Sequence, residues 1–402
     1  MRVGVITSTY PRHADDYAVP WMREGLIQLS GRGVDVEVFA PSYRGLGDHV
    51  LDGIPVRRFR YFPAPMERLT HEEGATNKIG NPLFQLLTLP YLACGVRAAS
   101  RWAKTRSLDV IHVHWPFPHG LFAEAVRRVS GIPVVAMCHG AGLSLAHRKP
   151  WVRALLRGSL RRADALLANS EDTALRMRAL VERDVTVIPF GTTVDASPRS
   201  QRTDGPPTLL FTGRLIQRKG VEYLIEALPR ILAKREVRVV ITGDGNRRTS
   251  IENSIRAHGL EGVVEMCGFV SNERLRDLYA TSDVYVLPAV HDDGGDTEGL
   301  GVPLIEAALH ALPIVATGIG GIVDVVKDRE TGLWAPERDP AGIAAAVLEL
   351  LDDPELGRRL GEAARQHVRA RFDWDSITDD LIAVYDGVLS CTSKRPFAAR
   401  SA

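Results

Sequence analysis

The chain has 402 residues, a length that predicts two or three domains with room for sizeable hydrophobic cores. With 25% charged and 45% hydrophobic residues, it has the composition of a globular protein and not of a disordered or fibrous one. Because 50 Lys and Arg stand against 49 Asp and Glu, the formal charge is +1. No overall field therefore favours a nucleic-acid partner.

The cysteines and the N-terminal residues bear on the compartment in which the protein works. The four cysteines lie more than forty positions apart, which excludes a CxxC metal pair and argues against a dense disulfide framework. Residues 1–12 read as a strand and a loop, without the apolar stretch of a secretory signal. We therefore expect a cytoplasmic protein that is not exported.

The first half of the chain alternates short apolar runs with helical patterns. Nearly continuous apolar runs are typical of parallel strands that helices cover on both faces. Strands are predicted at 3–7, 34–40, 109–114, 132–138 and 164–169. Helices are predicted between them, among others at 20–30, 121–129 and 171–181. This order predicts one doubly wound α/β domain.

A second series of strands and helices follows a polar stretch. Residues 194–207 are rich in Ser, Pro, Gly and charge, which predicts an interdomain linker. Further strands are predicted at 208–212, 237–242, 263–267, 283–288 and 313–317. We expect Rossmann-like domains at 1–193 and 208–372, a helix at 373–390 and a disordered tail at 391–402. Because open α/β sheets bind ligands at the carboxyl ends of their strands, the two domains should face each other across a cleft.

Two cations follow the first strand of the second domain. Arg214 and Lys219 stand five positions apart before a predicted helix. Backbone N–H groups, the helix dipole and both side chains favour a phosphate there. Taken alone, the fragment could equally be a solvated basic turn. Gly243 and Gly245 follow the next strand and permit close approach of a ligand, although any strand-to-helix turn can need such glycines.

Two carboxylates bracket a glycine-bearing loop before another predicted helix. Glu298 and Glu306 are eight positions apart, and Glu306 lies beyond the first turn, where a negative charge no longer helps the helix. A carboxylate accepts from two neighbouring hydroxyls, so a sugar at Glu298 and a ribose at Glu306 would suit both residues. The N–H groups of Leu300, Gly301 and Val302 would bind the polar groups between them. The alternative is one exposed and one salt-bridged Glu without a ligand.

Three histidines, His112, His114 and His119, lie close together and raise the question of a metal site. Residues two apart on a strand share a face, but no carboxylate or thiol has a matched local spacing. The adjacent aspartates at 15–16 and 292–293 would point apart in an extended chain. We expect neither a metal ion nor another cofactor.

The order and spacing of several motifs closely resemble those of the retaining glycosyltransferases of family 4, which have the GT-B fold. The resemblance extends over nearly the whole chain. In the second half it rests on GRL at 213–215, KG at 219–220, GDG at 243–245, CGFVSNERL at 267–275 and EGLGVPLIEA at 298–307. In the first half, the segments at 8–42, 58–83, 109–120 and 134–140 look like a subgroup associated with cell-surface polysaccharide assembly.

The resemblance implies a role for each matching position in the second half. Arg214 and Lys219 would hold the diphosphate of a nucleotide sugar, Glu306 the ribose and Glu298 the hydroxyls of the donor sugar. The backbone at 269–270 would contact the base. The implied donor-binding set is Gly213, Gly243, Gly245, Phe269, Val270, Leu300, Gly301, Val302 and Glu306.

The resemblance also assigns residues to the transferred sugar and the acceptor. His139 would lie beside the donor sugar and the acceptor. The implied catalytic set is His139, Arg214, Lys219 and Glu298, and the implied acceptor-side residues are Tyr10, Asp16 and His114. The final helix should cross back to the first domain. Two departures concern the acceptor side and the hinge: His139 precedes GAG where the family often has a carboxylate, and 189–195 carry an insertion.

These implications predict a retaining, metal-independent glycosyltransferase. It would move a sugar from a nucleoside-diphosphate sugar to a hydroxyl of a glycan, glycolipid or lipid-linked acceptor in cell-surface polysaccharide biosynthesis. A sugar-nucleotide epimerase of similar architecture and a non-catalytic sugar-nucleotide-binding protein stay open as alternatives. A dehydrogenase would need a GxGxxG turn that the sequence lacks.

A peripheral position at the inner face of the membrane also stays open. The apolar window at 82–96 is too short to span a bilayer. Together with Arg68 and the basic stretch 57–62, it could lie against an anionic bilayer. Equally, these could be ordinary helix and loop positions.

Overall fold

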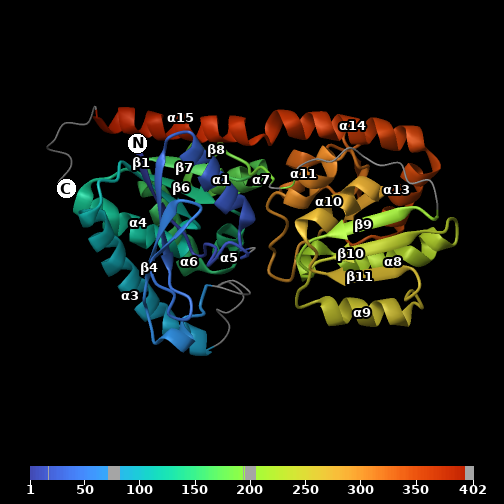
Figure 1. Cartoon of the computed structure of the whole chain (residues 1–402), viewed down its shortest axis with the longest axis horizontal. Coiled ribbons are helices and arrows are strands. Elements are labelled where there is room, and N and C mark those ends of the chain that lie inside the picture. The colour runs from blue at the N-terminus through green and yellow to red at the C-terminus, as the bar shows by residue number, and fades with distance from the viewer. Residues whose placement is uncertain (17, 71–81, 193, 195–204, 394–402) are drawn as a thin grey trace. The chain divides into compact units, whose positions relative to one another are not determined.

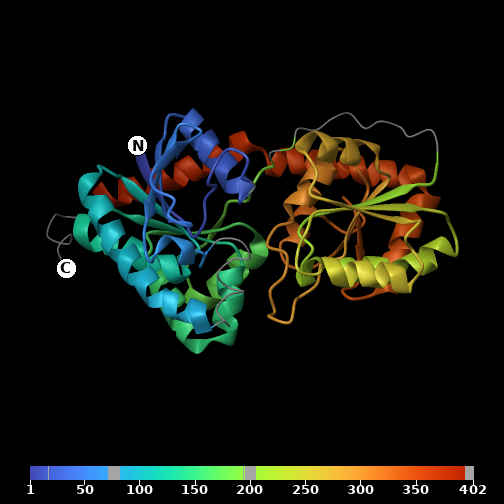
Figure 2. The ribbon, with the colours of Figure 1, turned by 60° about the horizontal axis from the view of Figure 1, so that its bottom comes forward.

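The computed structural model describes residues 1–16, 18–70, 82–192, 194 and 205–393. The chain divides into two compact units, Met1–Phe190 with the segment from Trp374 onward, and Gly191–Asp373. In each unit, a largely parallel sheet carries helices on both faces (Figures 1 and 2). The predicted α/β fold class is confirmed, since strands buried on both faces require such layers.

The described part of the first unit contains one sheet of strand order β3-β4-β2-β1-β5-β6-β7-β8. Strand β3 pairs antiparallel with β4, and the other neighbouring strands pair in parallel. The strands are β1 (Arg2–Ile6), β2 (Asp35–Pro41), β3 (His49–Leu51), β4 (Ile54–Phe59), β5 (Val110–His114), β6 (Val134–Cys138), β7 (Ala165–Ala168) and β8 (Thr186–Val187). The helices are α1 (Pro20–Gly31), α3 (Pro82–Thr105), α4 (Pro116–Ser130), α5 (Ala141–Arg148), α6 (Pro150–Arg162) and α7 (Glu171–Val181), with a short 3-10 turn at Ala64–Met66.

The described part of the second unit contains a parallel sheet of order β11-β10-β9-β12-β13-β14, the arrangement of a dinucleotide-binding fold. The strands are β9 (Thr208–Thr212), β10 (Arg238–Thr242), β11 (Val264–Gly268), β12 (Val284–Leu287), β13 (Ile314–Thr317) and β14 (Leu333–Ala335). The helices are α8 (Val221–Leu232), α9 (Arg248–Ala257), α10 (Asn272–Thr281), α11 (Val302–Leu309), α12 (Ile322–Val325), α13 (Pro340–Asp352) and α14 (Pro354–Arg371), with a 3-10 turn at Gln217–Lys219.

The last helix, α15 (Trp374–Ser393), belongs to the first unit. Its Trp374 ring lies against Gly25 of α1, and Asp375 pairs with Arg32 at 2.6 Å. Farther along, the buried Tyr385 hydroxyl lies 2.8 Å from Nδ1 of His112 on β5. The helix therefore packs through both an ion pair and a buried polar contact, and it continues three residues beyond its predicted end at 390. Residues 195–204 of the predicted linker and 394–402 of the predicted tail lie outside the described residues.

Helix α3 contains the apolar window that the sequence places at 82–96. Leu87 and Tyr91 are buried, whereas Leu86 and Leu89 are exposed, so α3 buries one face against the unit. Among the helices that the structure describes, none has both the length and the apolar character needed to cross a bilayer.

Candidate active site

The loop that follows β9 places the Lys219 side chain in the interior of the second unit. The Lys219 side chain is only 7% exposed and ends in an ion pair with Glu298. The next residue, Gly220, has φ +65°, and a Cβ there would stand 1.8 Å from the carbonyl oxygen of Pro288. Only glycine fits at this position, so the sequence KG at 219–220 has a steric reason. Arg214, at the start of the same loop, stays exposed.

The ion pair fixes the charge state of Glu298. Burial alone would raise the pKa of Glu298, but the positive charges of Lys219 and Arg218 outweigh it and lower the pKa to about 2. For Lys219, burial lowers the pKa of the ammonium group, and the Glu298 carboxylate opposes that shift. A buried charge is stable only when it is paired, and we therefore treat both groups as ionised at neutral pH.

Helix α11 begins directly beyond this pair. Gly301 is the N-cap with φ +85°, and no side chain caps the helix. The first backbone N–H groups of a helix have no acceptor within the helix and carry the positive end of its dipole. Leu300 is buried and Val302 is half-buried, and both lie next to Gly301 at the start of the helix. The ion pair and the helix start together form a place where an anion is stabilised.

Glu306 lies one turn farther along α11 and is buried among hydroxyl groups. The Tyr279 hydroxyl of α10 donates to Oε2 at 2.7 Å, and the Thr192 hydroxyl donates to Oε1 at 3.2 Å. The Tyr279 oxygen also lies 2.7 Å from Oγ1 of Thr212, the last residue of β9. Burial raises the pKa of Glu306 to about 7, although both donated hydrogen bonds and the charge of Lys219 oppose the shift. Glu298 and Glu306, eight residues apart, therefore have opposite electrostatic surroundings.

Gly243 and Gly245 pack against the loop that follows β9. A Cβ at Gly243 would lie 2.0 Å from the Gly213 carbonyl oxygen, and one at Gly245 would lie 2.3 Å from that of Leu215. The Gly213 N–H in turn donates to the carbonyl of Thr242, the end of β10. Close packing of two backbone turns thus accounts for these glycines without a ligand, and their contact with a donor stays a prediction.

Phe269 and Val270 follow β11, the edge strand. The Phe269 ring is 77% exposed, which is unusual for a large apolar side chain outside a binding surface. Val270 is half-buried. Both lie at the carboxyl end of the sheet, the edge at which α/β folds bind ligands.

In the first unit, two neighbouring strands bring His114 and His139 together. His114 ends β5, and His139 follows β6, its partner strand. Nδ1 of His114 lies 2.9 Å from Nε2 of His139, so one ring donates and the other accepts. Burial lowers the pKa of His139 to about 3 and that of His114 well below its usual value. Both rings are therefore neutral at pH 7.

An aromatic shell surrounds this histidine pair. The Trp21 ring lies 5.0 Å from His139 and stacks on Phe190 at 3.8 Å. The Trp115 ring lies 4.7 Å from His139. Within the described residues, Nδ1 of His139 and Nε2 of His114 are buried and make no hydrogen bond. Each ring therefore keeps one polar atom for a partner from outside this cluster.

Of the other histidines, His112 lies beside this pair, with its ring centroid 4.2 Å from that of His114. His112 contacts Tyr385, and His119 lies 2.6 Å from the Tyr91 hydroxyl. Across the residues the structure describes, no three His, Cys, Asp or Glu side chains are arranged to hold a metal ion. Tyr10 is fully buried, and Asp16 accepts from the backbone N–H and the Nε of its neighbour Arg12. Their acceptor role stays a prediction.

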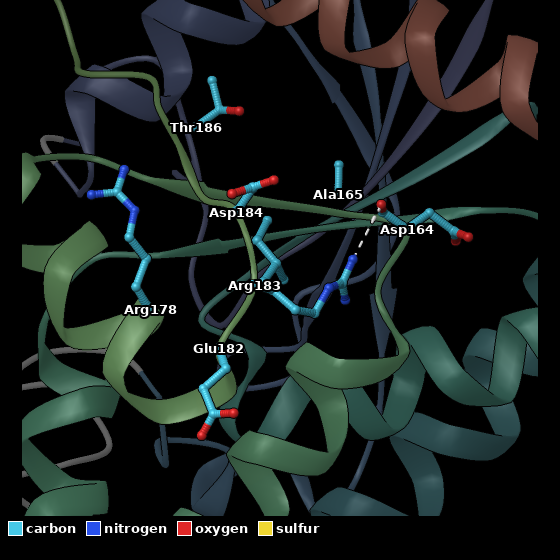
Figure 3. Close-up of a pocket in the computed structure, with 8 residues that line it drawn as sticks. Asp164, Ala165, Arg178, Glu182, Arg183, Asp184 and Thr186 are labelled. Carbon is cyan, nitrogen blue, oxygen red and sulfur yellow. Dashed lines mark hydrogen bonds between the residues drawn. The ribbon is translucent and has the colours of Figure 1, made fainter.

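A pocket of about 660 Å³ lies at the amino-terminal ends of strands in the first unit's sheet (Figure 3). Asp164 and Thr186 line it at the beginnings of β7 and β8. Its Arg183 donates to the carbonyls of Leu160 and Ala163, at the end of α6. The polar groups here cap a helix, and the pocket lies away from the carboxyl edge at which α/β sheets bind ligands.

Comparison with known proteins identifies the family. The model of "Glycosyl transferases group 1" matches residues 194–367, and that of "Glycosyltransferase Family 4" matches residues 23–196. A glycogen synthase of Mycobacterium tuberculosis is 30% identical over 69% of this chain and 68% of its own length. A phosphatidyl-myo-inositol mannosyltransferase of Mycobacterium leprae is 30% identical over 73% of this chain and 77% of its own. The chain belongs to the family 4 glycosyltransferases.

Solved structures show that this glycosyltransferase has the GT-B fold. A sucrose-phosphate synthase from Thermosynechococcus elongatus superposes with a TM-score of 0.77 at 20% identity, over 97% of this chain and 99% of that one. HepE of Anabaena, solved in complex with UDP and glucose, has a TM-score of 0.70 at 18% identity, over 96% and 100% of the two chains. An uncharacterized glycosyltransferase of Methanocaldococcus jannaschii is 32% identical, but this chain spans only 45% of it.

The sequence singles out the charged residues of the candidate site but not the uncharged groups that contact them. Tyr279 and Thr212 hold Glu306, and Trp21 and Phe190 cover His139. Thr212 ends β9 directly before the GRL motif, and a hydroxyl at that position could have been recognised as a candidate site residue from the sequence. Tyr279 gives no such signal, because it lies near the end of a helix and reaches Glu306 only through tertiary packing.

Proposed function

We propose that this glycosyltransferase transfers a sugar from a nucleoside-diphosphate sugar to a hydroxyl acceptor. The observation that carries the proposal is the Lys219–Glu298 ion pair at the start of α11, one turn before the buried Glu306. A cation beside a helix N-terminus suits a diphosphate, while the carboxylates suit vicinal hydroxyls. A nucleotide sugar carries these groups in this order: sugar, diphosphate and ribose.

The chemistry follows from where charge develops. As the bond between the sugar and the phosphate breaks, negative charge grows on the departing nucleoside diphosphate. This negative charge would be stabilised by Lys219, by the exposed Arg214 and by the N-terminus of α11. These groups are already in place, so no reorganisation is needed during the reaction. Because these groups supply positive charge themselves, we propose that the transfer needs no metal ion. Activity should then persist in the presence of a chelator.

We propose that the transfer retains the anomeric configuration, as the resemblance to the retaining family 4 enzymes implies. The described ring and hydrogen-bond contacts of His139 come from His114, Trp21, Trp115 and Phe190. None of these residues is a carboxylate, and Glu298, which we assign to the sugar hydroxyls, is held in an ion pair with Lys219, so we propose no covalent sugar intermediate. The acceptor hydroxyl would then attack from the face of the leaving group, with a phosphate oxygen of the donor taking its proton. His139, a neutral ring with one free nitrogen, would hydrogen-bond a sugar hydroxyl.

For the acceptor, we propose a glycan, glycolipid or lipid-linked saccharide in the assembly of cell-surface polysaccharide, at the cytoplasmic side of the membrane. Support comes from the resemblance of the first half of the chain and from the relative in M. leprae, whose name denotes transfer to a phosphatidylinositol. Incubation with labelled donor should move label into an organic-extractable or polymeric product. Label found only in a free sugar or an isomerised nucleotide sugar would contradict the proposal.

The decisive test begins with a panel of uridine and guanosine diphosphate sugars. One member should raise the thermal midpoint of the protein, because a ligand that binds only the native state stabilises it. With that donor, Lys219→Ala and Arg214→Ala should each lower kcat on the order of 10²-fold to 10³-fold. Glu226→Gln, at an exposed position of α8, is a matched control and should leave kcat unchanged. If both cation variants stayed within about threefold of the wild type, less than 1 kcal/mol of barrier, the site assignment would be wrong.

A further inference from the structure

A basic surface on the first unit has no partner in the described part of the chain. It consists of the exposed residues of 147–162, the end of α5 and all of α6, and we call it the α6 surface. This stretch contains five Arg and one Lys, and no acidic residue occurs between Glu124 and Asp164. The chain as a whole is nearly neutral, so this run of positive charge is a local feature. None of the six cations of this stretch forms an ion pair with any residue that the structure describes, and all of them except the half-buried Arg157 are exposed.

The α6 surface also exposes large apolar side chains. Trp151 is 56% exposed and Leu155 43%, and the two lie one turn apart on the same side of α6. Val152, Leu156 and Leu160 are buried on the opposite side and attach the helix to the core. A large part of both outward side chains therefore stays in water, which costs free energy.

Trp151 is held in position next to the histidine site. Its ring meets that of Phe117 edge-on, with centroids 5.6 Å apart. Phe117 lies three residues beyond His114, at the carboxyl end of β5. The α6 surface thus adjoins the edge of the sheet that carries His114 and His139.

The basic stretch at 57–62 offers no comparable charge. Arg57 pairs with Glu37 and Asp48, both at 2.8 Å. Arg58 is buried and donates to backbone carbonyls, and Arg60 pairs with Glu67 at 2.7 Å. These arginines make contacts within the unit. This matches the interpretation of 57–62 as ordinary structural positions and not as a membrane-facing stretch.

We propose that the α6 surface docks the first unit on an anionic phospholipid bilayer. Cations that flank exposed Trp and Leu match a membrane interface, where headgroup charge attracts the basic side chains and the apolar groups enter the acyl boundary. Trp favours this boundary because its ring is apolar while its N–H is polar. The inference builds on the proposed function, since docking beside His139 would bring the unit to an acceptor hydroxyl displayed at the headgroup level.

The test is cosedimentation of the full chain with vesicles of phosphatidylglycerol and phosphatidylcholine. The protein should bind at low salt, bind less at high salt and ignore vesicles of phosphatidylcholine alone. Each interfacial cation contributes about fivefold to partitioning, so Arg148→Gln/Lys149→Gln should weaken binding about 30-fold. Trp151→Ser/Leu155→Ser should weaken it at least about tenfold. Arg148 and Lys149 are exposed and form no ion pair with a described residue, so the charge variant should keep the wild-type thermal midpoint. Trp151→Ser/Leu155→Ser removes the ring contact with Phe117, so its vesicle binding is measured well below its own midpoint.

Arg359→Gln/Arg369→Gln is the matched control, because it removes two exposed cations from α14. It should bind vesicles like the wild type. At saturating vesicle concentrations, where affinity no longer matters, brominated lipid should quench the tryptophan emission of the wild type more than that of Trp151→Phe. Wild-type protein that stays in the supernatant at low salt would overturn the proposal.

Equal losses in the α14 and α6 charge variants would also overturn the proposal, since the attraction would then be non-specific. So would duplex RNA binding that matches vesicle binding and survives Trp151→Ser/Leu155→Ser, because the surface would then be a nucleic-acid site. Donor binding is measured on the same proteins. Vesicle binding without donor binding would refute the proposed function and leave the docking surface intact, and the reverse result would refute docking alone.

Discussion

The pKa of Glu306 makes the stability of the second unit depend on pH. Burial raises the pKa of Glu306 from 4.5 to about 7. A carboxylic acid whose pKa rises on folding stabilises the native state while it is protonated, and this stability is lost as pH rises through the folded value. One pKa unit corresponds to about 1.4 kcal/mol, so ionising Glu306 fully in the unliganded protein should cost about 3 kcal/mol. Between pH ~5.5 and ~8, the loss should be about 2 kcal/mol.

Urea unfolding of the unliganded protein at a series of pH values measures this loss. Glu306→Gln keeps the shape and can still accept the hydrogen bond from Tyr279, but it cannot ionise. The unfolding transition that shifts in this variant is that of the second unit. For that transition, the unfolding free energy of the wild type should fall by about 2 kcal/mol more than that of the variant between pH ~5.5 and ~8. Glu226→Gln, on an exposed part of α8, should follow the wild type. Parallel curves for the wild type and Glu306→Gln would refute the reasoning.

Donor binding should have the opposite dependence on pH. If the ribose donates two hydroxyl groups to Glu306, binding favours the ionised carboxylate and releases a proton below the pKa. The affinity for a nucleoside diphosphate should then rise about tenfold between pH ~6 and ~8, and in Glu306→Gln the rise should disappear. Calorimetry in buffers of different ionisation enthalpy would detect the released proton directly. A slope that survives in the variant would assign the titration to another group.

Three other substitutions test separate parts of the site. Glu298→Gln should lower the rate of transfer far more than the affinity for the bare nucleoside diphosphate, because its proposed partner is the sugar and the bound diphosphate itself supplies a counter-charge to Lys219. Calorimetry that showed both collapsing together would contradict this. Tyr279→Phe removes the donor to Oε2 of Glu306 and should cost about 1 kcal/mol of unfolding free energy below pH 7, measured by urea denaturation. Gly220→Ala would place a Cβ 1.8 Å from the Pro288 carbonyl oxygen and should cost about 3 kcal/mol or more, so a wild-type thermal midpoint would show that this turn is not tightly fixed.

The sequence predicted the layers of the fold because burial on both faces leaves a direct trace in it. Strands such as Val134–Cys138 are apolar along their length, and the structure finds them inside a parallel sheet. The short edge strands β3, β8 and β14 and the internal strand β4 were not predicted. Edge strands bury fewer residues, and the two residues of β8 carry no pattern of their own.

The site was predictable to the extent that its residues follow strands directly. Arg214 and His139 do, and the sequence places both at the correct edge. The hydrogen bond between His114 and His139 depends on β5 and β6 being neighbours, which is a tertiary fact. Sequence reasoning also treated Lys219 and Glu298 as binding different parts of a ligand, and it did not anticipate that they pair with each other.

The ion pair between Lys219 and Glu298 constrains how the candidate active site can work. A buried ammonium group without a partner costs several kcal/mol, and so does a buried carboxylate. Lys219 and Glu298 therefore keep each other charged before any donor arrives. An ammonium has three donors and a carboxylate two oxygens, so each retains capacity for the ligand while the pair persists. Removing Lys219 would consequently change the charge and position of Glu298 as well. For this reason, Lys219→Ala/Glu298→Gln should lose little more activity than Lys219→Ala alone; losses that multiply would mean that the two residues act on the donor independently.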